Sequence, residues 1–166
     1  MTNEMVELYF LEPEVSGNHG EQTVYGSAEN VKREGISGKI QFLHYEFQGW
    51  LGDDLAEATP AFIISSRLEE ALRNSHLKDC KIEPCLITAS DEFKERQPDI
   101  AIPAFYRWIP LGTIDVEGQT YKNWSGHHFC LSAKGELVVT KTALDLLKKF
   151  SMDHCDVIPL TPVQIS

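Results

Sequence analysis

Adjacent acidic residues close to a histidine are the first feature of this sequence that suggests chemistry. The stretch HYEFQGWLGDDL begins at His44 and contains the neighbouring carboxylates Asp53 and Asp54. Carboxylates combined with histidine can hold a metal ion or perform acid–base catalysis. A histidine pair, His127 and His128, supplies further candidate ligands. One hypothesis is therefore a small metal-dependent hydrolase that uses the aspartate pair and one of these two histidines.

The spacing of these residues argues against a metal centre. Adjacent side chains usually point in different directions, and consecutive residues of a strand face opposite sides of the sheet. His127 and His128 at the start of a strand would therefore not share one ion. Aspartates directly before LAEA are typical of the first turn of a helix, where they cap the backbone and favour its dipole. We expect at least one of Asp53 and Asp54 to cap a short helix, and we predict no metal ligands.

The familiar catalytic and cofactor-binding motifs do not occur in this sequence. It has no G-x-S-x-G nucleophile elbow, no phosphate-binding G-x-x-x-x-G-K-[ST] and no G-x-G-x-x-G after a predicted strand. The four cysteines form no C-x-x-C pair that would predict a zinc or redox site. We therefore predict a protein that is not an enzyme and has no catalytic residues and no cofactor.

Aromatic residues near turns suggest binding instead. Aromatic anchors surrounded by acidic residues are typical of surfaces that bind other proteins, although about half of such aromatics would be expected in a core. The residues that we predict to contact a partner are Tyr45, Trp50, Asp53, Asp54, Glu57, Tyr106 and Trp108.

The charge balance restricts the possible partners. The net charge is −10, from 25 acidic and 15 basic residues in a chain of 166. Such a field repels nucleic acid and anionic membranes and attracts basic proteins, although it also serves solubility alone. No apolar run is long enough to span a membrane, and the acidic N-terminus does not resemble a signal peptide. We expect a cytoplasmic protein with reduced cysteines that binds neither nucleic acid nor membranes.

The predicted elements form a single α+β domain over residues 1–166, with a mostly antiparallel sheet and two main helices. Residues 16–39 are rich in Gly, Ser, Asn and charge, which predicts a long loop with one short strand at 23–25. In the segment that begins PAFIISSRLEE, Ser66 and Glu69 have the spacing of a capping box at a helix start.

A second segment matches this one after a shift of 75 positions without a gap. The shift places Ser65 on Thr140, Leu72 on Leu147 and Cys80 on Cys155, so both segments predict a strand, a helix and a returning strand. Two similar strand–helix–strand units are expected. They could be an internal repeat or two units that share a common pattern, and the cysteines in both would be structural.

The order of five segments resembles a known family. They are YFLEPEVSG, LHYEFQGWLGDDL, PAFIISSRLEEALRNSHL, PAFYRWIPLG and LVVTKTALDLLKKF, spread over roughly residues 7–160. This order is similar to that of the predicted immunity proteins of bacterial polymorphic-toxin systems, a family first described as a domain of unknown function. The W-L-G-D-D turn from Trp50 to Asp54 carries most of the resemblance.

The resemblance implies a non-enzymatic protein that binds a cognate toxin and blocks it in the cell that makes both. The toxin would be a basic protein if the acidic charge steers its capture. Two alternatives stay open: the metal-dependent hydrolase described above, and an interaction module without a toxin partner. The oligomeric state is not predicted.

Overall fold

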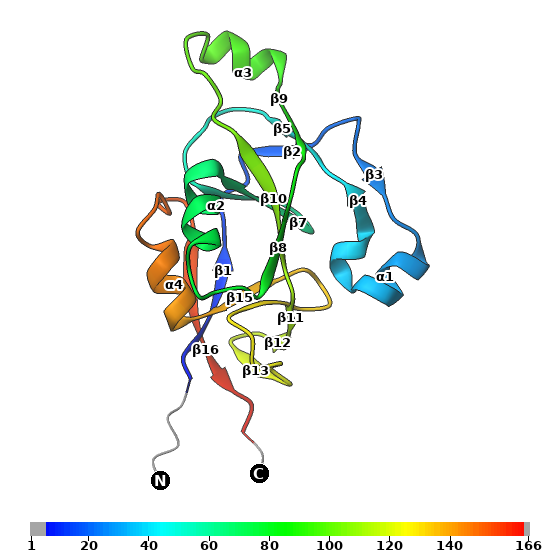
Figure 1. Cartoon of the computed structure of the whole chain (residues 1–166), viewed down its shortest axis with the longest axis vertical. Helices are drawn as coiled ribbons and strands as arrows, with labels where there is room; N and C mark the ends of the chain where they lie inside the picture. Colours follow the sequence, from blue (N-terminus) through cyan, green and yellow to red (C-terminus); the bar gives the residue numbers. More distant parts are fainter. Residues whose placement is uncertain (1–5, 165–166) are drawn as a thin grey trace.

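A computed structural model describes residues 6–164 of the chain. It has the predicted mixed α+β fold, in which the strands pair mostly antiparallel (Figure 1). Three strand pairs are parallel, and the remaining pairs are antiparallel. None of the helices in the described part of the chain is both long enough and apolar enough to cross a membrane.

The largest sheet has seven strands. Their spatial order is β11 (Gly112–Thr113), β14 (Phe129–Leu131), β15 (Leu137–Thr140), β1 (Leu8–Glu12), β16 (Asp156–Pro162), β13 (Thr120–Lys122) and β12 (Asp115–Glu117). Apolar residues on both sides of a Ser-Ala-Lys-Gly sequence are typical of a hairpin, and the pairing of Phe129 with Val139 shows that β14 and β15 form one.

Three smaller sheets complete the strand structure. The four-stranded sheet has the order β6 (Leu55–Ala58), β7 (Ala61–Ser65), β10 (Phe105–Pro110) and β8 (Cys80–Glu83). The three-stranded sheet has the order β2 (Gly17–His19), β5 (His44–Phe47) and β9 (Leu86–Ala89), and the two-stranded sheet pairs β3 (Val24–Tyr25) with β4 (Ile40–Phe42).

Two helices belong to strand–helix–strand segments with the same pattern of connections. The helix α2 (Ser66–Arg73) joins β7 to β8, and α4 (Lys141–Leu147) joins β15 to β16. In each segment one antiparallel strand from elsewhere in the chain lies between the two joined strands: β10 in the first and β1 in the second. Both helices lie on the same side of the molecule (Figure 1), and their apolar faces enter one shared core.

The N-cap of α2 lies one residue before the position that the sequence predicted. The N-cap of α2 is Ser65, whose hydroxyl accepts a hydrogen bond from the Leu68 N–H, so the predicted capping box of Ser66 and Glu69 is wrong. The last residue of the buried strand has the extended backbone that an N-cap requires, and Ser66 is already inside the helix. Thr140 caps α4 in the same way through the Ala143 N–H.

The segment 16–39 is more ordered than the sequence predicted. The strand expected near 23–25 is present as β3, but the segment also contains β2, the helix α1 (Ala28–Glu34) and a 3₁₀ turn (Ile36–Lys39). Ser27 and Asn30 form a reciprocal capping box at the start of α1. This helix buries none of its side chains, which explains why hydrophobic periodicity did not reveal it. The helix α3 (Asp91–Arg96) lies at the far end of the molecule from the termini (Figure 1).

Candidate functional site

The two adjacent aspartates do not cap a helix. The LAEA segment that follows them is the strand β6, so the prediction of a short helix there is wrong. The Asp53 and Asp54 side chains are buried, with 1% and 8% of their surface exposed. Their carboxylates accept hydrogen bonds from the distant loop between α4 and β16. The pair therefore joins two parts of the fold and does not lie on the predicted binding surface.

Asp54 is held by several donors at once. Its oxygens accept hydrogen bonds from the Ser65 hydroxyl at 2.6 Å, from Arg67 Nε and Nη2 at 2.8 and 2.6 Å, and from the Ser151 N–H at 2.8 Å. Desolvation is the largest single influence on the Asp54 pKa and would raise it, but the hydrogen bonds from Arg67, Ser65 and Ser151 together lower that pKa below its usual value. Asp54 therefore stays ionised as a structural anion.

Asp53 belongs to a group that could chelate a cation. It accepts the N–H groups of Asp153 and His154 at 3.1 and 2.8 Å. The His154 Nδ1 atom lies 3.4 Å from Asp53 Oδ1 and 3.2 Å from Glu14 Oε2. One ligand atom from each of Glu14, Asp53 and His154 lies within 4.8 Å of the others. Sequence spacing did not reveal this group, because its members come from three distant segments.

The other expected ligands do not join this group. The His127 Nδ1 atom lies 2.6 Å from the Ser125 hydroxyl, and the His128 Nδ1 atom lies 2.7 Å from the hydroxyl of Thr140. Within residues 6–164, neither histidine forms a hydrogen bond with Asp53 or Asp54. The set that the hydrolase hypothesis used, the aspartate pair with one of these two histidines, is therefore not assembled among the described residues.

Three of the predicted contact aromatics are inside the protein or partly covered. Tyr45 is fully buried, and its hydroxyl donates to the Glu57 carbonyl oxygen at 3.3 Å. Trp108 is 1% exposed and packs edge-on against Phe62 and Phe129 in the shared core. Tyr106 is half-buried against the same core. Because they are buried, Tyr45 and Trp108 are corrected from partner-binding residues to core residues.

Trp50, in contrast to these aromatics, is substantially exposed to solvent. It is 46% exposed, and its indole Nε1–H donates to Glu14 Oε2 at 3.0 Å. The same Glu14 carboxylate accepts the Asp53 N–H at 2.7 Å through its other oxygen. The Glu14 side chain, which is 2% exposed, therefore fixes the edge of an aromatic side chain that is itself partly exposed to solvent.

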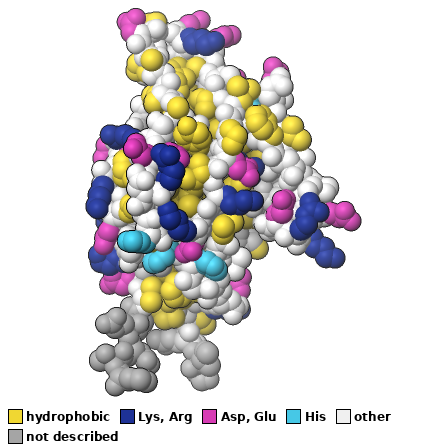
Figure 2. Space-filling view, in the orientation of Figure 1, with side chains coloured by type: hydrophobic (Ala, Val, Ile, Leu, Met, Phe, Trp, Pro, Cys, Tyr) yellow, Lys and Arg dark blue, Asp and Glu magenta, His cyan; other side chains and the backbone are white. Residues whose placement is uncertain are grey.

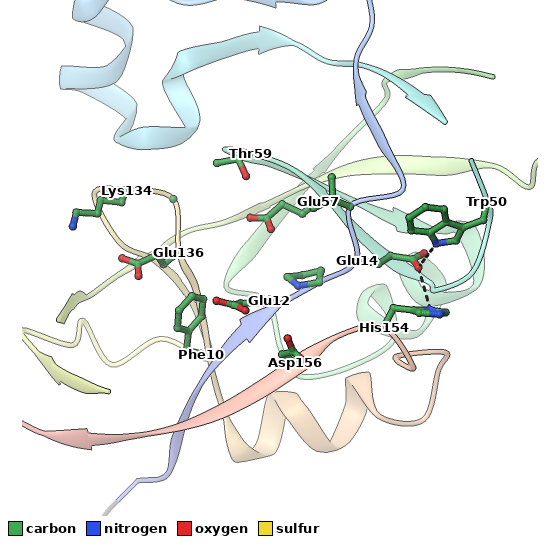
Figure 3. A pocket seen from close by; sticks show the side chains of 13 residues that line it. Phe10, Glu12, Glu14, Trp50, Glu57, Thr59, Lys134, Glu136, His154 and Asp156 are labelled. Carbon is green, nitrogen blue, oxygen red and sulfur yellow. Dashed lines mark hydrogen bonds and ion pairs between the residues drawn. The ribbon is translucent and has the colours of Figure 1, made fainter. Parts of the chain in front are cut away.

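Trp50 stands at one end of a pocket with a volume of about 580 Å³ (Figure 3). Five carboxylates line this pocket, together with Lys134 and His154. They belong to Glu12, Glu14, Glu57, Glu136 and Asp156. Apolar surface from Phe10, Pro13 and Val15 completes the walls. We call this the acidic pocket. Of the seven residues predicted from the sequence, Trp50 and Glu57 line it.

Three connections of the backbone build the acidic pocket. The chain beyond β1 runs along β6, where the Glu57 N–H donates to the Glu14 carbonyl at 2.9 Å. The antiparallel pairing of β1 with β16 sets Glu12 directly opposite Asp156. The β14–β15 turn contributes Lys134 and Glu136. Strands from the seven-stranded and four-stranded sheets therefore meet at this pocket.

The carboxylates in the acidic pocket repel one another. Opposed residues of an antiparallel pair lie on the same face of the sheet, so Glu12 and Asp156 are like charges side by side. Desolvation by burial, reinforced by the charge of Glu12, raises the Glu57 pKa from 4.5 to about 7. The pocket is therefore short of positive charge, and a cation that entered it would relieve this repulsion.

The sequence contained only a weak signal for the remaining members of this pocket. Glu12 and Glu14 are two residues apart at the end of a strand, a spacing that places two side chains on one face. Glu136, His154 and Asp156 reach the pocket only through tertiary pairing, which no local pattern indicates.

The acidic pocket differs from the face shown in Figure 2. There, basic and acidic side chains are interspersed on both sides of a band of apolar side chains. Comparison of the sequence with family models and with curated proteins finds no significant match. A functional proposal therefore depends on the residues and geometry described above.

Proposed function

We propose that this protein binds a cognate bacterial toxin and neutralises it, and that the acidic pocket with Trp50 at its rim is the contact surface. The observation that carries the proposal is the pocket itself, which combines five carboxylates with an exposed, hydrogen-bonded tryptophan. The order of segments that resembles polymorphic-toxin immunity proteins supports the same reading. The toxin would be a basic protein, and the complex would form in the cytoplasm.

The physical chemistry of protein association favours such a site. Binding energy is usually concentrated in a few aromatic and charged residues at the centre of an interface. A fixed aromatic side chain loses less conformational entropy when it is covered than a mobile one does. Trp50 is fixed in this way by its bond to Glu14. The net charge of −10 adds long-range attraction that speeds the capture of a basic partner.

We further infer that the two similar strand–helix–strand units expected from the sequence form the frame of this site. Trp50 and Glu57 precede the first unit, and Glu136, His154 and Asp156 belong to the second unit or to its turn. The pocket lies between the segment that precedes the first unit and residues of the second, so a partner bound there would contact both of these parts of the chain.

Co-expression with the protein encoded by the neighbouring gene tests this proposal. Wild-type protein should restore growth of cells that produce the toxin and should be recovered in a complex with it. Trp50→Ala combined with Glu57→Gln should lose both effects. Tyr25→Ala is the matched control, because Tyr25 is 61% exposed and does not line the acidic pocket. No rescue and no complex with the wild-type protein would overturn the proposal. A complex without rescue would favour an interaction module without a toxin partner.

A metal-dependent hydrolase is the second candidate, and the Glu14–Asp53–His154 group is the observation that favours it. The hydrogen bonds to Glu14 and Asp53 weigh against it, because backbone and indole N–H groups already occupy their oxygens. Metal analysis of the purified protein decides between the two. Stoichiometric Zn, Mn or Mg in the wild type that is lost in His154→Ala would support the hydrolase. Purified protein without metal would count against it.

A further inference from the structure

The shape of the acidic pocket indicates what part of a partner it accepts. One end holds the Trp50 indole with Glu14 and His154, and the carboxylates of Glu12 and Glu57 lie away from that end (Figure 3). The apolar walls suit the methylene stem of a long side chain. The carboxylates suit a cationic head group, and the indole face offers a cation–π contact.

We propose that the acidic pocket receives one arginine or lysine side chain of the bound protein, and that entry of this cation displaces the proton held by Glu57. The inference rests on the proposed function, because the side chain belongs to the toxin. In this step the O–H bond of the Glu57 carboxyl breaks, the proton passes to solvent, and the carboxylate that remains pairs with the cation.

The surroundings of Glu57 support this coupling. The ionisable groups that line the pocket with it are Glu12 and Glu14 from β1 and its extension, Lys134 and Glu136 from the hairpin turn, and His154 and Asp156 from the second unit. Four of these six groups are carboxylates, so the ionisation of Glu57 places a further negative charge beside like charges. A positive charge in the pocket replaces that repulsion with attraction and favours the ionised form.

The coupling predicts binding that strengthens with pH. With a pKa of about 7, the ionised fraction of Glu57 rises from about one tenth at pH 6 to about nine tenths at pH 8. If only the ionised form pairs with the cation, affinity for that cation should rise about tenfold between these two pH values. His154 also lines the pocket, so a His154 variant is tested beside the Glu57 variant.

The experiment uses N-acetyl-arginine amide as the probe and the uncharged N-acetyl-citrulline amide as its matched control. The full chain is titrated with each at pH 6 and pH 8, and the NMR signal of the Trp50 indole N–H reports occupancy. We expect saturable binding of the arginine probe alone, about tenfold tighter at pH 8. The pH effect should vanish in Glu57→Gln and persist in both His154→Gln and the exposed-site control Glu117→Gln.

Two results would overturn the inference. One is an arginine probe that binds no more tightly than the citrulline probe. The other is a pH effect that survives in Glu57→Gln. Growth rescue by the wild-type protein is scored separately. If rescue occurs without arginine binding, the toxin-binding function stands and the side-chain inference is wrong. If arginine binds but no toxin is neutralised, the proposed function fails instead.

Discussion

At the scale of single residues, Asp53 and Asp54 connect distant segments of the chain. Their carboxylates replace the missing hydrogen-bond partners of N–H groups at positions 151, 153 and 154. Buried N–H groups without partners are costly, so these two side chains fix the loop that carries His154 to the acidic pocket. The motif that first suggested a catalytic centre therefore acts mainly by holding the site together.

Replacement of Asp54 tests this structural role. Asp54→Ala leaves the Ser151 N–H and the Ser65 hydroxyl without their acceptor, and should lower the free energy of unfolding by about 2–3 kcal/mol. Asp145→Ala is the matched control, because its pair with Lys141 is exposed and its loss should cost less than about 0.5 kcal/mol. Urea denaturation measures both. Equal stability of the two variants would contradict the role given to Asp54.

The lowered pKa of Asp54 gives this contribution a pH dependence. A carboxyl group whose pKa is lower in the folded protein stabilises it above the unfolded pKa, here 3.8, and this contribution is lost as the pH falls through the folded pKa. The stability difference between wild type and Asp54→Asn should therefore shrink as the pH falls below 3.8. Denaturation series in acidic buffers would show this, and a constant difference would argue against an ionised Asp54.

The pKa of Glu57 is shifted in the opposite direction to that of Asp54, so its effect on stability has the opposite pH dependence. Its folded pKa of about 7 exceeds the ordinary value of 4.5, so the folded protein binds more protons between these values and loses stability as the pH rises through that window. Glu57→Gln should remove this loss. At pH 8 the variant should be more stable than the wild type by about 1 kcal/mol, after allowance for solvent screening in the open pocket. At pH 4 the two should be similar, and thermal unfolding at both pH values checks the prediction.

At the scale of elements, the two N-caps show how local chemistry sets helix starts. Ser65 and Thr140 each end a buried strand and begin a helix, and each hydroxyl also contacts a residue of the preceding strand segment: Asp54 in the first case and His128 in the second. The two cap residues, Ser65 and Thr140, occupy corresponding positions under the shift of 75 residues. Each cap therefore joins its helix to the rest of the sheet.

Adjacent serines provide a direct test of the cap assignment. Ser65→Ala removes the acceptor of the Leu68 N–H and should cost about 1–2 kcal/mol of stability. Ser66→Ala changes an exposed residue inside the helix and should alter stability by less than about 0.5 kcal/mol. Chemical denaturation of the two variants measures the difference. A larger effect at Ser66 would restore the cap position that the capping-box pattern predicted.

The elements that were predicted correctly are those with strong local patterns. The β14–β15 hairpin has a turn sequence flanked by apolar strands, and α2 and α4 carry apolar stripes, so local physics defines them. The helix α1 has no buried face, and its only signal was its capping residues. Asp53 and Asp54 were misassigned because their partners lie about 100 positions away in the chain. Trp50 and Glu57 were found, but their pocket partners depend on strand pairing between distant segments.

At the scale of the whole molecule, the two strand–helix–strand units hold each other in place. Asp53 and Asp54, which precede the first unit, bond to the helix–strand loop of the second. A second hydrogen bond runs in the other direction. His128 precedes the second unit, and its N–H donates to the Asp79 carboxylate, in the helix–strand loop of the first unit, at 2.7 Å. The units also share one core, which contains Leu68 and Leu72 of α2 together with Leu144 and Leu147 of α4. These reciprocal hydrogen bonds fix the loop that carries His154 to the acidic pocket, and a fixed surface would lose little entropy on binding the proposed partner.

The central claim is that this protein binds a toxin domain at the acidic pocket, and its most direct test is the affinity for the protein encoded by the neighbouring gene. Calorimetry with a catalytically inactive toxin would compare the wild type with a Glu12→Gln/Glu57→Gln variant and with Glu117→Gln as the exposed control. Loss of two pocket carboxylates should weaken binding by at least about tenfold and reduce its salt dependence, while the control stays within about twofold of the wild type. A double variant that binds as tightly as the wild type would contradict the claim that the acidic pocket is the binding site.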